Sequence, residues 1–151
     1  MNIFTELTTD TILLDLRSET KPEVIAEMLD VLIAAGRIAA DKRAEVLAAL
    51  MAREAKMSTG MEHGIAIPHA KTDAVARLAA AVARKPAGVD FDAMDGQPSY
   101  FFIMTVSPAS RSGPHLQFIA EVSRILNDDQ VQTQLMQAQS AREVLEIMHR
   151  K

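Results

Sequence analysis

The segment SYFFIMTVS, residues 99–107, constrains the fold of this chain more than any other part of its sequence. Its apolar residues run almost without interruption, which is typical of a central strand buried on both faces of a sheet. Three other segments predict shorter strands: TILLDL (11–16), IAIPH (65–69) and LAAAVARK (78–85). Turn residues over 87–91 and 95–98 are expected to separate the last two strands. Such a sheet needs helices to cover it.

Two helices are predicted near the start of the chain. The first is expected to begin after Thr20, with Pro22 in its first turn and Glu23 completing a capping box, and to stop at Gly36. The second is predicted over 41–56, antiparallel to the first. Its expected inward residues are Val46, Leu47, Leu50 and Met51.

Three more helices are predicted after a loop over 107–115. They span 114–126, 128–138 and 141–149, the last with a capping box from Ser140 to Glu143. The expected inward side of the first of these carries Leu116, Ile119, Ala120, Ser123 and Ile125 or Leu126. The order of elements predicts an α/β fold, a mixed sheet with helices on its faces, in a single domain of residues 1–151.

Composition excludes several functions. Charged residues make up 24% of the 151, and the net charge is −4, which argues against a general nucleic-acid binder. No apolar run approaches the roughly 20 residues that span a bilayer, and no signal peptide is recognisable, so a cytoplasmic protein is expected, not embedded in a membrane. The absence of cysteine excludes disulfides, thiolate metal sites and a cysteine nucleophile within these residues.

Of the four histidines, His69 and His115 are the candidates for chemistry. Pro68 fixes the backbone before His69, which makes that histidine either an ordinary strand-end residue or a nucleophile held in place. His115 lies in the first turn of a predicted helix, where unpaired N–H groups favour an anion, although a partly exposed first-turn residue is the plain alternative. His63 and His149 are expected to be exposed.

Arg53 could bind phosphate oxygens, or it could be a surface arginine paired with Glu54. Two histidines with an arginine, and no carboxylate pair at an obvious spacing, suggest phosphoryl chemistry at nitrogen. Imidazole is nucleophilic near neutral pH, and a second histidine could stabilise the transferring group by a hydrogen bond. A metal site formed by His63, His69 and His115 is a third hypothesis, but the usual i, i+4 pattern of histidine ligands is lacking.

The segments RE (53–54) and STGMEHGIAIPHAK (58–71) resemble the active-site signature of enzyme IIA of the bacterial phosphoenolpyruvate-dependent sugar phosphotransferase system. The resemblance is to the fructose/mannitol type, which includes the nitrogen-regulatory enzyme IIA. It extends over nearly the whole chain, through FFIMTVSP, the His115-Leu116 pair and the closing SAREVL (140–145). It implies a mixed sheet of about five strands flanked by helices.

The resemblance also implies roles for residues. His69 would accept a phosphoryl group from the phosphohistidine of HPr, or of its nitrogen-branch paralogue, and pass it to a cysteine of an enzyme IIB. His115 and Arg53 match the family's second active-site histidine and its arginine, and Thr59 lies in the matching loop. Neither a cofactor nor a metal is implied. The chain departs from the family pattern at Glu62, which puts donor preference in question, and at Ala70, where the family often has glycine.

Because the acceptor cysteine is absent, the resemblance predicts a stand-alone enzyme IIA that docks with separate partners. Met57 and Met61 are candidates for docking, while Phe118 is expected in the core. The alternative function is regulatory: the phosphohistidine would be a signal that controls binding to a transporter or a kinase. The sugar, the acceptor and the oligomeric state are not predicted by the sequence.

Overall fold

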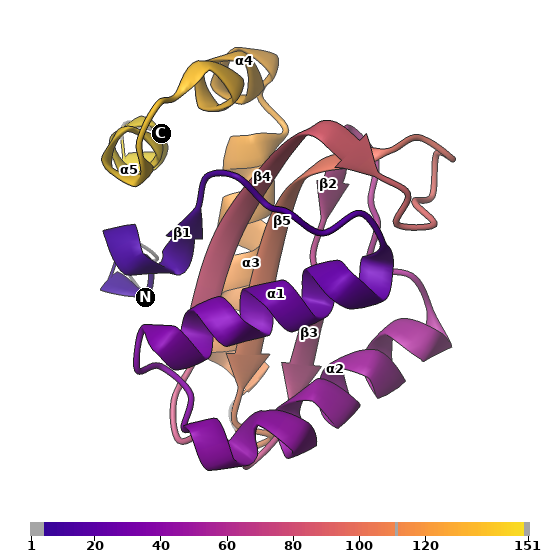
Figure 1. The fold of residues 1–151 in the computed structure, drawn as a ribbon, viewed down its shortest axis with the longest axis vertical. Helices are drawn as coiled ribbons and strands as arrows, with labels where there is room; N and C mark the ends of the chain where they lie inside the picture. Colours follow the sequence, from indigo (N-terminus) through magenta and orange to yellow (C-terminus); the bar gives the residue numbers. More distant parts are fainter. Residues whose placement is uncertain (1–4, 111, 150–151) are drawn as a thin grey trace.

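The protein, described by a computed structural model over residues 5–110 and 112–149, is built on a five-stranded mixed sheet (Figure 1). The strands are β1 (Ile12–Leu13), β2 (Ile65–Ala66), β3 (His69–Lys71), β4 (Ala79–Val89) and β5 (Ser99–Ser107). Their order is β1-β4-β5-β2, with β3 also pairing with β5. Only β4 and β5 are antiparallel among these pairs. The predicted α/β fold is confirmed.

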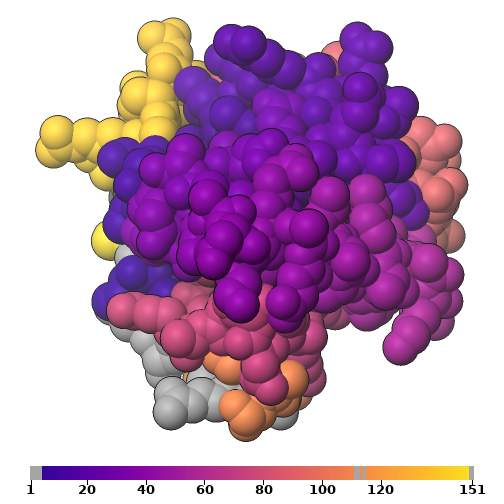
Figure 2. Space-filling model, turned by 60° about the horizontal axis from the view of Figure 1, so that its bottom comes forward, coloured from indigo at the N-terminus to yellow at the C-terminus, as the bar shows by residue number. Residues whose placement is uncertain are grey.

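Helices cover both faces of this sheet. One face carries α1 (Lys21–Ala34) and α2 (Arg43–Lys56), and the other carries α3 (Ser112–Leu126) with α4 (Asp129–Gln137) and α5 (Ala141–His149) (Figure 1). Short 3-10 turns at Thr9–Thr11 and Ala40–Lys42 precede β1 and α2. Figure 2 shows the helix pair over the middle of one side of the molecule and the C-terminal helices at its edge. No helix in the described ranges is long and apolar enough to cross a membrane.

The central strand β5 has the bounds that its sequence predicts, and only Tyr100 along it is not fully buried. Successive side chains point to opposite faces of a sheet, so the strand contributes side chains to two hydrophobic cores, one on each face. Phe102, Met104 and Val106 pack toward α1 and α2, whereas Phe101 and Ile103 pack toward α3 to α5.

Helix ends follow the predicted stop and start signals with one exception. Gly36, at φ +75°, ends α1 in a Schellman arrangement: its N–H donates to Ile33 O, and Arg37 N donates to Leu32 O. Ser140 Oγ accepts from the Glu143 N–H, as expected. The predicted capping box of α1 is wrong in detail, because the Thr20 hydroxyl donates to the Glu23 carboxylate and its oxygen accepts from no backbone N–H of the helix.

Four further predictions are corrected. The single strand 65–69 is divided, because Pro68 has no N–H for the ladder, and His69 begins β3 instead of ending a strand. The turn predicted over 87–91 lies partly within β4, which continues to Val89 through a bulge.

On α3 the buried residues are His115, Phe118, Val122, Ile125 and Leu126, while Leu116 is exposed. The helix is rotated by about one residue from its predicted orientation, because a histidine occupies an inward position. In α2, Leu47 and Met51 are only half-buried.

Candidate active site

His69 is positioned by the pairing of β3 with β5. It lies in register with Thr105, and its neighbour Ala70 packs into the core under α1 and α2. Alternation along the strand therefore places His69 on the same face as Thr105, the face that α3 covers. The histidine is half-buried, and its Nδ1 lies 2.8 Å from the Ile67 carbonyl oxygen. A carbonyl can only accept, so Nδ1 carries the proton and Nε2 keeps its lone pair.

His115 lies beside His69. It extends from the first turn of α3, is 1% exposed, and places its ring centroid 5.3 Å from that of His69 with the ring planes at 55°. Its Nδ1 is 3.0 Å from Ser107 Oγ and 3.3 Å from Thr105 Oγ1. Its Nε2 is buried and has no hydrogen-bond partner within the described part of the chain. This atom is therefore free to bond with a group bound beside His69.

Both histidines are neutral at physiological pH. Burial lowers the pKa of His69 below 6.5, and the nearby charges of Arg53 and Lys71 add to the effect, while the bond to Ile67 opposes it. Burial, together with His69 and Lys71, lowers the pKa of His115 to about 4. A neutral imidazole with a lone pair at Nε2 is the nucleophilic form of His69.

Arg53 lies on the last turns of α2 and lines the same cleft as His69. The cleft has a volume of about 480 Å³, and its walls are Ala49, Ala52, Arg53, Lys56, His69, Ala70 and Lys71. One guanidinium N–H of Arg53 donates to Met57 O at 2.8 Å, which fixes the side chain at the end of the helix. Three cationic side chains beside a neutral histidine favour an anionic group, although the chain as a whole is acidic.

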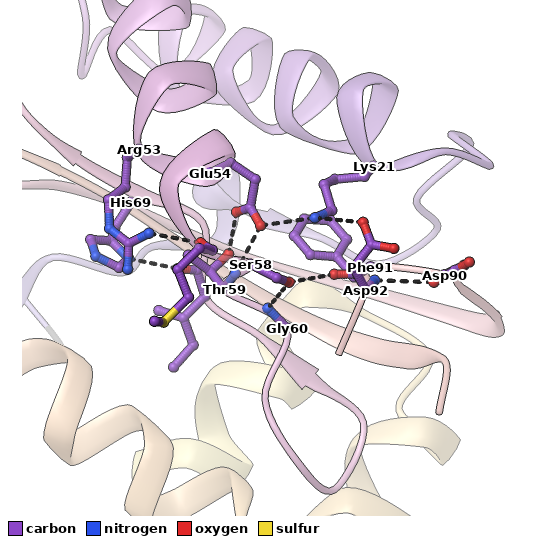
Figure 3. Close-up of polar contacts among 12 residues, drawn as sticks. Lys21, Arg53, Glu54, Ser58, Thr59, Gly60, His69, Asp90, Phe91 and Asp92 are labelled. Atoms are coloured by element: carbon purple, nitrogen blue, oxygen red, sulfur yellow. Dashed lines mark hydrogen bonds and ion pairs between the residues drawn. The ribbon is translucent and has the colours of Figure 1, made fainter. Parts of the chain in front are cut away.

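Thr59 is buried, and both of its hydrogen-bond donors go to Glu54 (Figure 3). Its N–H donates to Oε2 at 2.8 Å and its hydroxyl to Oε1 at 2.5 Å. Glu54 is therefore a participant in the site that the sequence reasoning missed: it was considered only as a surface partner of Arg53. Its spacing gave a signal, since it follows the inward Leu50 by four residues and so lies on the buried face of α2.

The remaining histidines lie elsewhere. His63 and His149 are exposed, as predicted, and His63 has a left-handed backbone with φ +64°. Glu62 and His63 line a separate hollow of about 360 Å³ with Met61, Met94 and Ile67. The structure thus places His69, His115 and Arg53 around one site. Thr59 lies next to this site, and His63 lies outside it.

Comparison with known proteins identifies the family. The family model described as "Phosphoenolpyruvate-dependent sugar phosphotransferase system, EIIA 2" matches residues 6–151. The chain belongs to this family. Among curated relatives of this EIIA chain, the "PTS system fructose-specific EIIA component" of Haloferax volcanii is 41% identical over 129 residues, which is 85% of this chain and 82% of the relative. The "PTS system fructose-specific EIIABC component" of Bacillus subtilis is 36% identical over 99% of this chain, which spans 23% of that longer protein.

Solved structures agree with the family. Nitrogen regulatory protein IIA-Ntr from Neisseria meningitidis superposes with a TM-score of 0.88 at 29% identity, over 98% of this chain and 99% of that one. The complex of enzyme IIAMtl with phosphorylated enzyme IIBMtl from Escherichia coli gives a TM-score of 0.81 at 24% identity, over 96% and 98% of the two chains, and so shares the fold. The resemblance inferred from the signature is confirmed.

Proposed function

We propose that this EIIA chain is a phosphocarrier in which His69 accepts a phosphoryl group from an HPr-type phosphohistidine and passes it to an enzyme IIB cysteine. One observation carries the proposal: His69 donates through Nδ1 to Ile67 O, so its Nε2 lone pair is available beside a cationic cleft. The family supports phosphoryl transfer, and the IIA–IIB complex of E. coli supports an enzyme IIB as acceptor.

The transfer balances without a further reactant. Nε2 of His69 forms a bond to phosphorus as the N–P bond of the donor breaks and the donor imidazole leaves as a neutral ring. The phosphorylated His69 ring carries a positive charge while Nδ1 keeps its proton, and the Ile67 carbonyl stabilises that charge by accepting the hydrogen bond. A thiolate then attacks phosphorus, and His69 leaves neutral. The acceptor cysteine lies outside this sequence, which has none.

The neighbouring residues have distinct roles in this proposal. His115 receives hydrogen bonds at Nδ1 from the hydroxyls of β5 and donates its Nε2–H to the phosphoryl oxygens. Arg53 neutralises charge on the same group from the side of α2. Thr59 contributes through the loop it anchors, since its donors are already bound to Glu54.

Intact-mass spectrometry tests the proposal. After incubation with phosphoenolpyruvate, enzyme I and HPr, the chain should gain one acid-labile, alkali-stable phosphoryl group. His69→Ala should not gain it, whereas His63→Ala, a matched change at an exposed histidine, should. No gain with several HPr-type donors, or a gain that persists in His69→Ala, would contradict the phosphocarrier.

A regulatory role is the second candidate, because the chain superposes on a nitrogen regulatory protein over nearly its full length. In that case the charge on phosphorylated His69 would change the affinity for a transporter or a kinase. Experiments on purified phosphorylated protein distinguish the phosphocarrier from the regulator. Transfer of the phosphoryl group to fructose-type enzyme IIB within seconds supports the carrier, and retention with all enzyme IIB proteins tested supports the regulator.

A further inference from the structure

Glu54 is a buried carboxylate that accepts from three donors in two parts of the chain, one on Lys21 and two on Thr59 (Figure 3). It is 8% exposed, and its Oε2 lies 3.0 Å from Lys21 Nζ at the start of α1. The same lysine lies 3.0 Å from Asp92 Oδ2 and 5.1 Å from the centroid of the Phe91 ring. The cation compensates the buried negative charge, without which the carboxylate would be costly in that position.

The loop that Glu54 holds is also fixed from its other side. Ser58 Oγ donates to Phe91 O at 2.6 Å, and Gly60 N donates to Ser58 Oγ at 3.0 Å. A Cβ at Gly60 would lie 2.8 Å from Phe91 O and from Ala93 Cα, so only glycine allows this approach. The segment 58–60 is therefore clamped between α2 and the connection of β4 to β5.

This clamped segment continues directly to the reactive histidine. Thr59, bound twice to Glu54, accepts a hydrogen bond at its own carbonyl from Ile67 N at 3.0 Å. The carbonyl of the same Ile67 accepts from His69 Nδ1 at 2.8 Å. Two hydrogen bonds join Glu54 to Thr59 and one forms each later link, and together they join the Glu54 carboxylate to the His69 ring.

We propose that Glu54 is a positioning residue that fixes the tautomer of His69 through Thr59 and Ile67. The consequence for catalysis rests on the proposed phosphocarrier function; the structural part does not. Charged acceptors form shorter and stronger bonds than neutral ones, so a carboxylate holds Thr59 more rigidly than an amide or a water would. With Ile67 held in turn, its carbonyl stays in place to accept from Nδ1, and the Nε2 lone pair remains on the side of the cleft.

Two readouts test this proposal. Nitrogen-15 NMR of the imidazole ring reports which nitrogen of His69 carries the proton in the unphosphorylated protein. Single-turnover phosphorylation by phosphorylated HPr reports the rate of transfer. In Glu54→Ala, the Nδ1–H tautomer of His69 should no longer predominate. The rate of phosphorylation should fall by about ten- to a hundredfold, the range found for outer-shell partners of metal-bound histidines. Glu54→Gln keeps one acceptor for Thr59 and should restore part of the Nδ1–H population and part of the phosphorylation rate.

Controls separate positioning from folding. Glu45→Gln removes an exposed carboxylate from the same helix and should change neither readout. If Glu54→Ala does not fold, Thr59→Val keeps the shape of the side chain, removes the hydroxyl bond to Glu54, and should shift the tautomer in the same direction. A folded Glu54→Ala or Thr59→Val with the wild-type ring spectrum, or with the wild-type rate, overturns the proposal. If the wild type itself accepts no phosphoryl group, the phosphocarrier function fails, and the ring spectra still decide whether Glu54 sets the tautomer.

Discussion

The two faces of the sheet are built from the same pair of strands, yet they differ in chemistry. Toward α1 and α2, strands β4 and β5 contribute apolar side chains to the core: Ala79, Ala81, Ala83, Phe102, Met104 and Val106. Toward α3 to α5 the middle is apolar as well, but the ends are polar. Thr105 and Ser107 lie at one end of that face, and Arg84 lies at the other.

The polar ends each hold one helix by directional bonds. The two hydroxyls contact His115 on α3, and the Arg84 guanidinium donates to carbonyls at the end of α4. Apolar contacts are strong in sum but do not specify where one atom lies, whereas hydrogen bonds do. We infer that the β4 and β5 side chains that face α1 and α2 mainly supply stability, and that those that face α3 supply positions for chemistry. Each prediction below tests this division.

The largest expected effect is on the apolar face. Phe102→Ala should lower the free energy of unfolding by about 3–5 kcal/mol, because the ring is fully buried under α1 and its loss leaves a cavity. Urea denaturation measures the change. The matched control, Met104→Leu, conserves volume and should cost less than about 1.5 kcal/mol. Phosphorylation of the folded fraction should be unchanged in both variants. A large fall in the rate for folded Phe102→Ala would contradict the division.

The next effect concerns pH and arises on the polar face. His115 has a pKa of about 4 in the folded protein against 6.5 in the unfolded chain, so the unfolded state binds the proton first as pH falls. Its contribution to stability is full above about pH 6.5 and is lost progressively down to about pH 4. At 1.36 kcal/mol per unit the loss is about 3 kcal/mol. Urea denaturation at stepped pH measures it. His115→Phe, which has no proton to bind, should flatten this part of the profile, and an equally steep profile in that variant would assign the loss to other groups.

The features that the sequence predicted correctly depend on local rules. The bounds of β5 follow from its continuous apolar run, and the end of α1 follows from a glycine that takes a left-handed conformation. Proline restricts the backbone before His69 and made that histidine a candidate, whose role stays a prediction. These signals lie within a few residues of the feature they predict.

The features that sequence reasoning missed depend on distant partners. Periodicity along α2 indicates that Glu54 points inward, but Lys21, which compensates its charge, lies 33 residues earlier, and no local pattern predicts that pair. The orientation of α3 was predicted wrongly because His115 was not counted as an inward residue, although the hydroxyls of β5 contact its Nδ1. The length of β4 was underestimated because a bulge absorbs Gly88, at φ +78°, within the strand.

A smaller effect is expected at the other polar end. Arg84 Nη1 lies 2.7–3.1 Å from the carbonyl oxygens of Leu135, Met136 and Ala138, so it closes the C-terminal end of α4. Arg84→Met should cost roughly 2 kcal/mol, since it leaves buried acceptors without a donor. Hydrogen exchange should show the loss of protection concentrated in α4 and α5. Arg142→Met, at an exposed arginine paired with Glu146, is the control and should change stability by less than about 0.5 kcal/mol. Uniform loss of protection across β4 and β5 would mean that Arg84 belongs to the general core.

The smallest stability effect should accompany a clear effect on transfer. Ser107→Ala removes the hydroxyl 3.0 Å from His115 Nδ1 and should cost only about 1 kcal/mol of stability. The rate of phosphorylation should fall by roughly tenfold, less than the hundredfold or more that follows loss of a transition-state donor, because Thr105 still contacts the ring. Ser99→Ala is a closely matched control: it removes a buried hydroxyl from the same face of β5, and that hydroxyl has no partner among the described residues. Equal rates for the two variants would show that the hydroxyls are passive. A lower rate only in Ser107→Ala would show that the hydroxyl acts by positioning His115 and not by stabilising the strand. Both variants lose a hydroxyl from β5, and only Ser107→Ala loses a contact with the histidine.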